Sequence, residues 1–130
     1  GYGVFPDNFM PHLWKIKQPY NVSVVATSAA LTSLQSADQL QMRGEDIISE
    51  RKHLYQSLQA IPWLQPYPTN GNFILCRVLD RDALDLQNTL ARSGILVRYF
   101  DKPGLRNHIR ISVGKPEHTK ALVDQLTKME

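Results

Sequence analysis

The residues best suited to chemistry in this chain are two arginines in neighbouring apolar segments. Arg98 lies in the segment ILVRYF, and Arg110 lies in the segment HIRISV. We expect the two segments to form an antiparallel hairpin around residues 101–107. If Phe100 faces His108 across this hairpin, the residue count places the two arginines directly opposite each other, on one face of the strands.

The placement of two guanidinium groups directly opposite each other needs a physical explanation, because like charges directly across two strands destabilise a sheet. An anion between them would supply one, since each guanidinium group matches a carboxylate or a phosphate with two parallel hydrogen bonds. The alternative is a solvent-exposed face on which the two long side chains point apart. Both interpretations are compatible with these residues, because a register inferred from sequence can slip by one position.

The other candidate residues indicate structural roles. The four histidines have no metal-ligand spacing and are predicted to be surface or helix-end residues, so we expect no metal site. Three aspartates cluster where a helix begins, where capping is favoured over metal binding. The only cysteine lies in an apolar run and is predicted to be a buried thiol. These residues are His12, His53, His108 and His118; Asp80, Asp82 and Asp85; and Cys76.

Two further features, a tyrosine and the opening tripeptide, can be interpreted in more than one way. Tyr20 could pack in a core, contact a ligand or lie in an interface. The opening Gly1-Tyr2-Gly3 is too short to predict a phosphate-binding loop and is typical of a turn.

The first half of the chain is predicted to be helical. Apolar residues at helical spacing predict a short helix over residues 7–17, with Asp7 or Asn8 as its cap. A second helix of small apolar residues is expected over residues 22–34, capped by Asn21 or Ser23, and such a helix needs a surface to pack against. A long surface helix should follow and end before Pro62; it spans residues 37–60.

The second half is predicted to form a β-α-β-β-α layer of the α+β class, with helices on one face of the sheet. A turn-rich connection marked by Pro66, Pro68, Asn70 and Gly71 precedes it. The expected strands are residues 73–79, 95–100 and 108–113, and the expected helices are residues 81–92 and 116–128.

Composition restricts the partners and the setting. The 130 residues suit one domain. No apolar stretch is long enough to span a membrane, and the net charge of +3 is spread along the chain, so neither a membrane nor a nucleic acid is an expected partner. The single cysteine indicates a reducing, cytoplasmic location. Because the chain opens with glycine rather than methionine, we expect it to be part of a longer protein.

Six motifs in a fixed order resemble the C-terminal part of histidinol-phosphate aminotransferases, and the resemblance extends over essentially the whole chain. They are GYGVFP, LWKIKQPYNVS, ERKHLYQSL, PYPTNGNFILC, GILVRY and IRISVGKPEHT. The resemblance implies a homodimeric fold-type I enzyme that uses pyridoxal 5′-phosphate. Its implied reaction transfers an amino group between L-histidinol phosphate and 2-oxoglutarate in histidine biosynthesis.

The same resemblance implies roles for individual residues. Arg110 would bind the substrate carboxylate, Arg98 would bind the anionic end of the substrate, and Tyr20 would be a further substrate contact. Asn72 is placed similarly, although it could equally be a turn residue. The lysine and the arginine that hold the cofactor are expected upstream of Gly1, so residues 1–130 alone should be inactive.

The implied organisation is a small C-terminal domain, in which residues 1–34 connect to a large domain and residues 35–130 form a helix and the α+β layer. Two alternatives remain. The first is a related lyase, such as a threonine-phosphate decarboxylase, although KQPYN and NFILC fit the aminotransferase better. The second is a free-standing ferredoxin-like module that binds a small anion. An RNA-binding module is disfavoured, because the strands offer few aromatic residues for base stacking.

Overall fold

The structure is a computed structural model that describes residues 3–19 and 22–129. The chain divides into two compact units, Gly1–Leu40 and Gln41–Glu130. Both arginines of the candidate site lie in the second unit. The division into a connecting segment and a small domain at residue 34 stays a prediction.

The first unit is helical, as expected. A 3-10 turn, η1 (Asp7–Phe9), leads into helix α1 (Met10–Ile16), and helix α2 (Val24–Leu34) follows. Ser23 caps α2, because its Oγ accepts a hydrogen bond from the backbone N–H of Ala26 at 3.1 Å. The predicted caps Asp7 and Asn8 were wrong: both lie inside the 3-10 turn, so their backbones are already helical and neither side chain caps α1.

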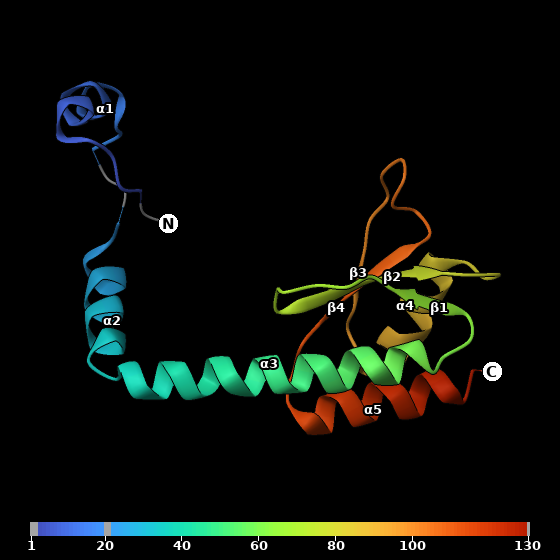
Figure 1. The fold of residues 1–130 in the computed structure, drawn as a ribbon. Coiled ribbons are helices and arrows are strands. Elements are labelled where there is room, and N and C mark those ends of the chain that lie inside the picture. The colour runs from blue at the N-terminus through green and yellow to red at the C-terminus, as the bar shows by residue number, and fades with distance from the viewer. Residues whose placement is uncertain (1–2, 20–21, 130) are drawn as a thin grey trace. The chain divides into compact units, whose positions relative to one another are not determined.

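Helix α3 (Ala37–Gln59) is one long helix, as predicted from its pattern of apolar and charged residues (Figure 1). Its last turns are the buried part, with Leu54 and Leu58 inside the core. Pro62 follows the end of the helix, and the chain turns there into the sheet.

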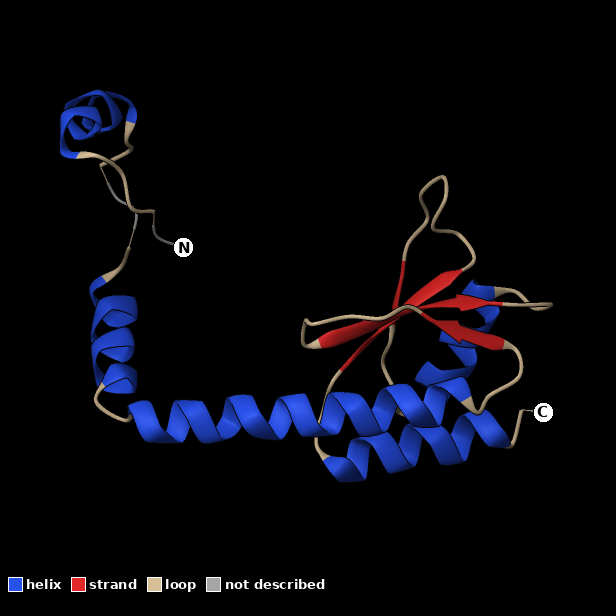
Figure 2. Ribbon diagram, in the orientation of Figure 1, coloured by secondary structure: helices blue, strands red, loops and turns tan. Residues whose placement is uncertain are grey.

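The second unit contains an antiparallel sheet of four strands in the order β1-β2-β4-β3 (Figure 2). The connection from β2 to β3 is helix α4, and helix α5 follows β4, which confirms the predicted β-α-β-β-α order. The bounds are β1 (Leu64–Pro66), β2 (Phe73–Val78), α4 (Ala83–Arg92), β3 (Arg98–Tyr99), β4 (His108–Ser112) and α5 (Pro116–Thr127).

The prediction of the sheet needs two corrections. Strand β1 was interpreted as part of a turn-rich connection because it contains Pro66, but Pro66 pairs with Cys76 on an edge strand, where a missing N–H is tolerated. Strand β3 is shorter than residues 95–100. One reason lies at its start, where the carbonyl of Val97 accepts a hydrogen bond from the side chain of Gln87 at 3.3 Å.

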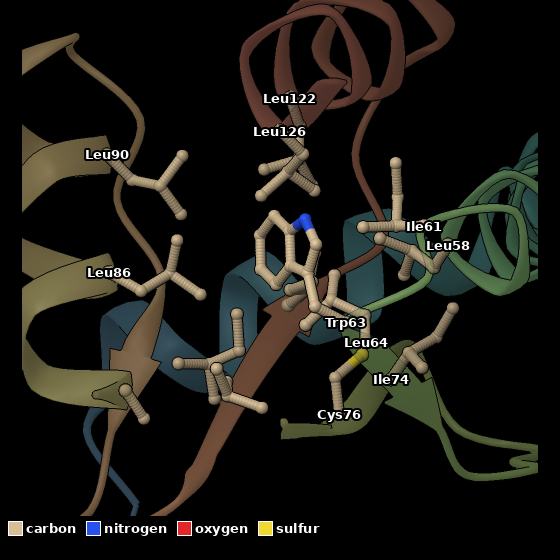
Figure 3. Close-up of a cluster of buried hydrophobic side chains, with 14 of the residues drawn as sticks. Leu58, Ile61, Trp63, Leu64, Ile74, Cys76, Leu86, Leu90, Leu122 and Leu126 are labelled. Atoms are coloured by element: carbon tan, nitrogen blue, oxygen red, sulfur yellow. The ribbon is translucent and has the colours of Figure 1, made fainter. Parts of the chain in front are cut away.

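The core lies on one face of this sheet. Alternate residues of β2 and β4 are buried, and leucines of α3, α4 and α5 cover them (Figure 3). Cys76 is fully buried in this cluster, as predicted, and burial raises the pKa of its thiol to about 12. The period-2 alternation therefore leaves the other face of the strands free to carry polar residues.

Candidate functional site

The two arginines occupy the positions that the hairpin argument predicts. Arg98 of β3 and Arg110 of β4 are directly opposite each other in the antiparallel register. Their neighbours in register, Tyr99 and Ile109, point to the core face, so the arginines lie on the opposite, open face. Arg98 is exposed and Arg110 is half-buried.

Two aromatic rings lie beside these guanidinium groups. The Cζ atom of Arg110 is 5.1 Å from the ring centre of Phe73 and 6.0 Å from that of Phe100. The Cζ atom of Arg98 is 5.7 Å from the same Phe100 ring. Both arginines therefore approach one ring, which favours convergence over the alternative in which the side chains point apart.

No carboxylate of the described residues pairs with either arginine. The acidic residue nearest to Arg98 in sequence is Asp101, and its carboxylate is bound by Arg106 Nε at 2.9 Å. The Nε atom of Arg110 is buried without a hydrogen-bond partner among the described residues. Two positive groups thus face the open side of the sheet without a described counter-charge, which suits them to bind an anion that arrives from that side.

His108 also belongs to this face and corrects the prediction that all four histidines are surface or helix-end residues. Its side chain is buried, its ring stacks on Tyr67 with centres 5.8 Å apart, and its Nε2 lies 3.4 Å from the Tyr67 hydroxyl. Burial and the neighbouring charge of Arg77 lower the pKa of His108, so the neutral ring is favoured. His118 does lie at a helix end, where its Nδ1 accepts from Lys115 N–H.

Of the two further candidate contacts, Tyr20 and Asn72, the structure describes only Asn72. Tyr20 and the residues Gly1 and Tyr2 lie outside the described residues. Asn72 is exposed just before β2, and its backbone carbonyl accepts a hydrogen bond from Val113 N–H at 2.9 Å. This contact joins the ends of β2 and β4, so the backbone of Asn72 has a structural role, and its side chain has no described partner.

Some residues around the site were missed by the sequence argument. Arg51 of α3 donates hydrogen bonds to the carbonyls of Asn70, at 2.7 Å, and Gly71, at 3.2 Å, and so holds the loop that leads into Phe73. Phe100 could have been recognised, because the hairpin register already placed it opposite His108. Nothing local in the sequence indicates the contact from Arg51, since it joins residues about twenty positions apart.

One aspartate of the cluster, Asp82, has the predicted capping role. Asp82 Oδ1 accepts hydrogen bonds from the backbone N–H groups of Leu84, at 2.8 Å, and Asp85, at 2.9 Å. In the parts of the chain that the structure describes, no group of three or more His, Cys, Asp or Glu residues could hold a metal ion. Within the same parts, no helix combines the length and the apolar character needed to cross a membrane.

Comparisons with known proteins show what this chain is similar to. Residues 1–128 match the family model of aminotransferase class I and II. The chain is 44% identical over 124 residues to the chloroplastic histidinol-phosphate aminotransferase of Nicotiana tabacum, an alignment that covers 95% of this chain and 30% of the relative. The chain therefore spans about a third of the length of such relatives.

Solved structures show the same fold. The histidinol-phosphate aminotransferase of Clostridium acetobutylicum matches with a TM-score of 0.82 and 20% identity, over 94% of this chain and 37% of that one. The L-threonine-O-3-phosphate decarboxylase of Porphyromonas gingivalis matches with a TM-score of 0.77 and 20% identity, over 97% of this chain and 40% of that one. The match of the family model to nearly every residue shows that this chain belongs to the class I and II aminotransferase family.

Proposed function

We propose that this chain provides the substrate-anion site of a histidinol-phosphate aminotransferase. The reaction is the transfer of an amino group between L-histidinol phosphate and 2-oxoglutarate. The observation that carries the proposal is the pair Arg98 and Arg110, which lie opposite each other on the open face without a described carboxylate partner.

The chemistry of both substrates suits this pair. L-histidinol phosphate carries a phosphate group whose several oxygens can accept hydrogen bonds from two guanidinium forks at once. 2-Oxoglutarate and its product glutamate each carry two carboxylates, one for each arginine. One pair of arginines can therefore serve both substrates, because guanidinium groups recognise phosphate and carboxylate with the same planar geometry.

Pyridoxal 5′-phosphate is the cofactor of this family, and it supplies the electron sink that lets an amino group leave one carbon skeleton and join another. The lysines of this chain do not fit its covalent attachment. All seven are exposed to solvent, so none of them is enclosed as a lysine that holds the cofactor would be. The role that we assign to this chain is therefore to bind and orient the anionic groups of the substrate.

The sequence relatives favour the aminotransferase over the decarboxylase. Both kinds of protein share the fold, so the fold does not distinguish them. The relative with 44% identity is named a histidinol-phosphate aminotransferase. The proposal also includes a homodimer in the cytoplasm, which light scattering of the purified protein and cell fractionation would test.

The substrate is tested with the protein at its full natural length. L-histidinol phosphate with 2-oxoglutarate should yield glutamate, whereas L-threonine phosphate should release no carbon dioxide. Carbon dioxide release without glutamate formation would indicate that the protein is the lyase rather than the aminotransferase.

The arginine pair is tested by replacing each arginine with lysine, which keeps the charge and removes the fork. Arg98→Lys and Arg110→Lys should each lower kcat/KM by about 10- to 100-fold, because a hydrogen bond to a charged group is lost. Arg92→Lys, at an exposed position of α4, is the matched control and should keep the wild-type value. Wild-type kcat/KM in both site variants would refute the proposed site.

A second candidate is a module that binds a small anion without chemistry. It is supported by one observation: the compact unit Gln41–Glu130 contains both arginines and all four strands. Tight binding of L-histidinol phosphate by the full natural protein, with no glutamate formed at any cofactor concentration, would favour this candidate.

A further inference from the structure

The ring of Phe100 lies close to both guanidinium groups of the pair. The Cζ atoms of Arg98 and Arg110 are 5.7 Å and 6.0 Å from its centre. An aromatic face carries partial negative charge, and a cation within about 6 Å of the ring centre is attracted to it. Phe100 is thus a neutral side chain that attracts two positive groups.

The contact that both arginines make with the Phe100 ring counteracts the repulsion between them. Two guanidinium groups directly across a strand pair repel each other and would be expected to separate into solvent. None of the described carboxylates pairs with either of them, and Asp101 is bound to Arg106. A ring that attracts both groups offsets part of the repulsion before any substrate arrives.

Phe73 provides an internal comparison, because it contacts one arginine rather than two. Its ring centre is 5.1 Å from the Cζ atom of Arg110, and no contact of this kind to Arg98 is found among the described residues. Phe73 lies on β2, which pairs with one edge of β4, whereas Arg98 lies on β3, which pairs with the other edge. A comparison of Phe100 with Phe73 therefore separates the effect of a ring that contacts both arginines from the effect of a ring that contacts one.

The orientation of the Arg110 side chain is not explained by a hydrogen bond at its Nε atom. Its Nε atom is buried and has no partner within the described part of the chain. An arginine side chain without such a bond can rotate, and holding it in one geometry costs conformational entropy. The contacts found for its guanidinium group among the described residues are those with the rings of Phe73 and Phe100.

From this geometry, we propose that Phe100 is a positioning residue that holds Arg98 and Arg110 toward one anionic ligand, whereas Phe73 holds Arg110 alone. The inference rests on the proposed function, because it assumes that the arginine pair is the substrate-anion site. It adds that affinity for the anion depends on an aromatic ring that need not touch the ligand.

The first experiment measures binding with the protein at its full natural length. Succinate and inorganic phosphate are the probes, and isothermal titration calorimetry follows each. Phe100→Leu should weaken binding of both probes by roughly 5- to 30-fold, and Phe73→Leu by roughly 2- to 5-fold, since two contacts are lost in the first case and one in the second. Phe100→Tyr keeps the ring and should bind as the wild type does.

A second substitution keeps the shape of the side chain and changes only the charge distribution of the ring. Phe100 is replaced by a trifluorinated phenylalanine, whose ring face is less negative. Binding should weaken as in Phe100→Leu, while the thermal unfolding midpoint stays near that of the wild type. This variant tests the proposal even if Phe100→Leu folds poorly.

Steady-state kinetics separates positioning from a general structural role. Phe100→Leu should raise KM for both L-histidinol phosphate and 2-oxoglutarate and leave kcat within about twofold, because ground-state anion binding is what changes. A structural defect would lower kcat and the unfolding midpoint together.

The outcomes distinguish the inference from the proposed function. If the wild type binds both probes and turns over substrate while the fluorinated protein binds equally well, the inference is overturned and the proposed function stands. A Phe100 effect no larger than that of Phe73 also overturns the shared role. If the wild type neither binds the probes nor forms glutamate, both fail.

Discussion

At the scale of single residues, the open face of the sheet is chemically distinct from the core face. Along the paired strands it carries Arg77, Arg98, Arg110 and His108, and none of its strand residues is acidic. Because the neutral form of His108 is favoured by burial and by Arg77, the arginines account for the positive charge of this face near neutral pH. A face of this kind attracts anions over a range of several ångströms and loses that attraction in high salt.

Cys76 gives a prediction about stability at high pH. Its pKa is raised from 9.0 to about 12 in the folded protein. Below pH 9 the thiol keeps its proton in both states, so folding is not affected. Above pH 9 the unfolded chain loses the proton while the folded protein keeps it. The free energy of unfolding should therefore fall by about 1.4 kcal/mol per pH unit from pH 9 toward 12.

Urea unfolding at pH 8 and pH 10 measures this effect, with Cys76→Ala as the comparison. The wild type should lose about 1.4 kcal/mol more than the variant between the two pH values. Equal losses in both proteins would mean that the thiol ionises as easily in the folded state as in the unfolded chain.

At the scale of elements, helix α4 depends for its placement on Asp82, the N-cap residue just before it. Asp82 accepts hydrogen bonds from two backbone N–H groups that have no partner within the helix, and Gly94, with a φ of 78°, adopts the left-handed conformation just after its end. The helix connects β2 to β3, so its beginning and end determine where Arg98 enters the sheet. Local signals in the sequence thus position one of the two arginines.

Asp82→Ala should lower the free energy of unfolding by about 1 kcal/mol, because both capping hydrogen bonds are lost. Asp82→Asn is the matched control, since asparagine also caps helices and should keep most of the stability. Chemical denaturation compares the three proteins. A loss in the asparagine variant as large as in the alanine variant would indicate that the charge, rather than the cap, stabilises the helix.

At the scale of the whole molecule, the two units differ in how they are stabilised. The unit Gln41–Glu130 has a buried core that joins three helices to one face of the sheet. In the unit Gly1–Leu40, none of the described residues is buried. Helix α2, made of small and apolar residues, is therefore not stabilised by a core of its own unit.

Leu90→Ala tests the core of the second unit. Leu90 lies on α4 and is fully buried, so its truncation should cost about 2–5 kcal/mol and lower the unfolding midpoint. Leu84→Ala, at a position of the same helix where the side chain is 43% exposed, should cost less than about 0.5 kcal/mol. Equal costs at the two positions, measured by urea unfolding, would contradict the assignment of α4 to the core.

The sequence by itself predicted the order of the helices and of strands β2, β3 and β4, and it suggested the register of the arginine pair that the structure has. Both depend on local rules: helical spacing and capping determine the helices, and the period of two residues in a strand determines which side chains share a face. Strands 98–99 and 108–112 are joined by a short loop, so counting residues across it was sufficient to place Arg98 opposite Arg110. The family resemblance likewise depended on short motifs in a fixed order, and the family match confirms it.

Only the tertiary structure decided which side chains surround that pair. The pairing of β1 with β2, the burial of His108 against Tyr67 and the position of Phe73 beside Arg110 all join residues that are distant in the sequence. No local pattern records such contacts, because they depend on which strands become neighbours when the core closes. The two arginines of the proposed anion site, and Phe100 beside them, could be placed from the sequence, whereas the position of Phe73 beside Arg110 required the packed sheet.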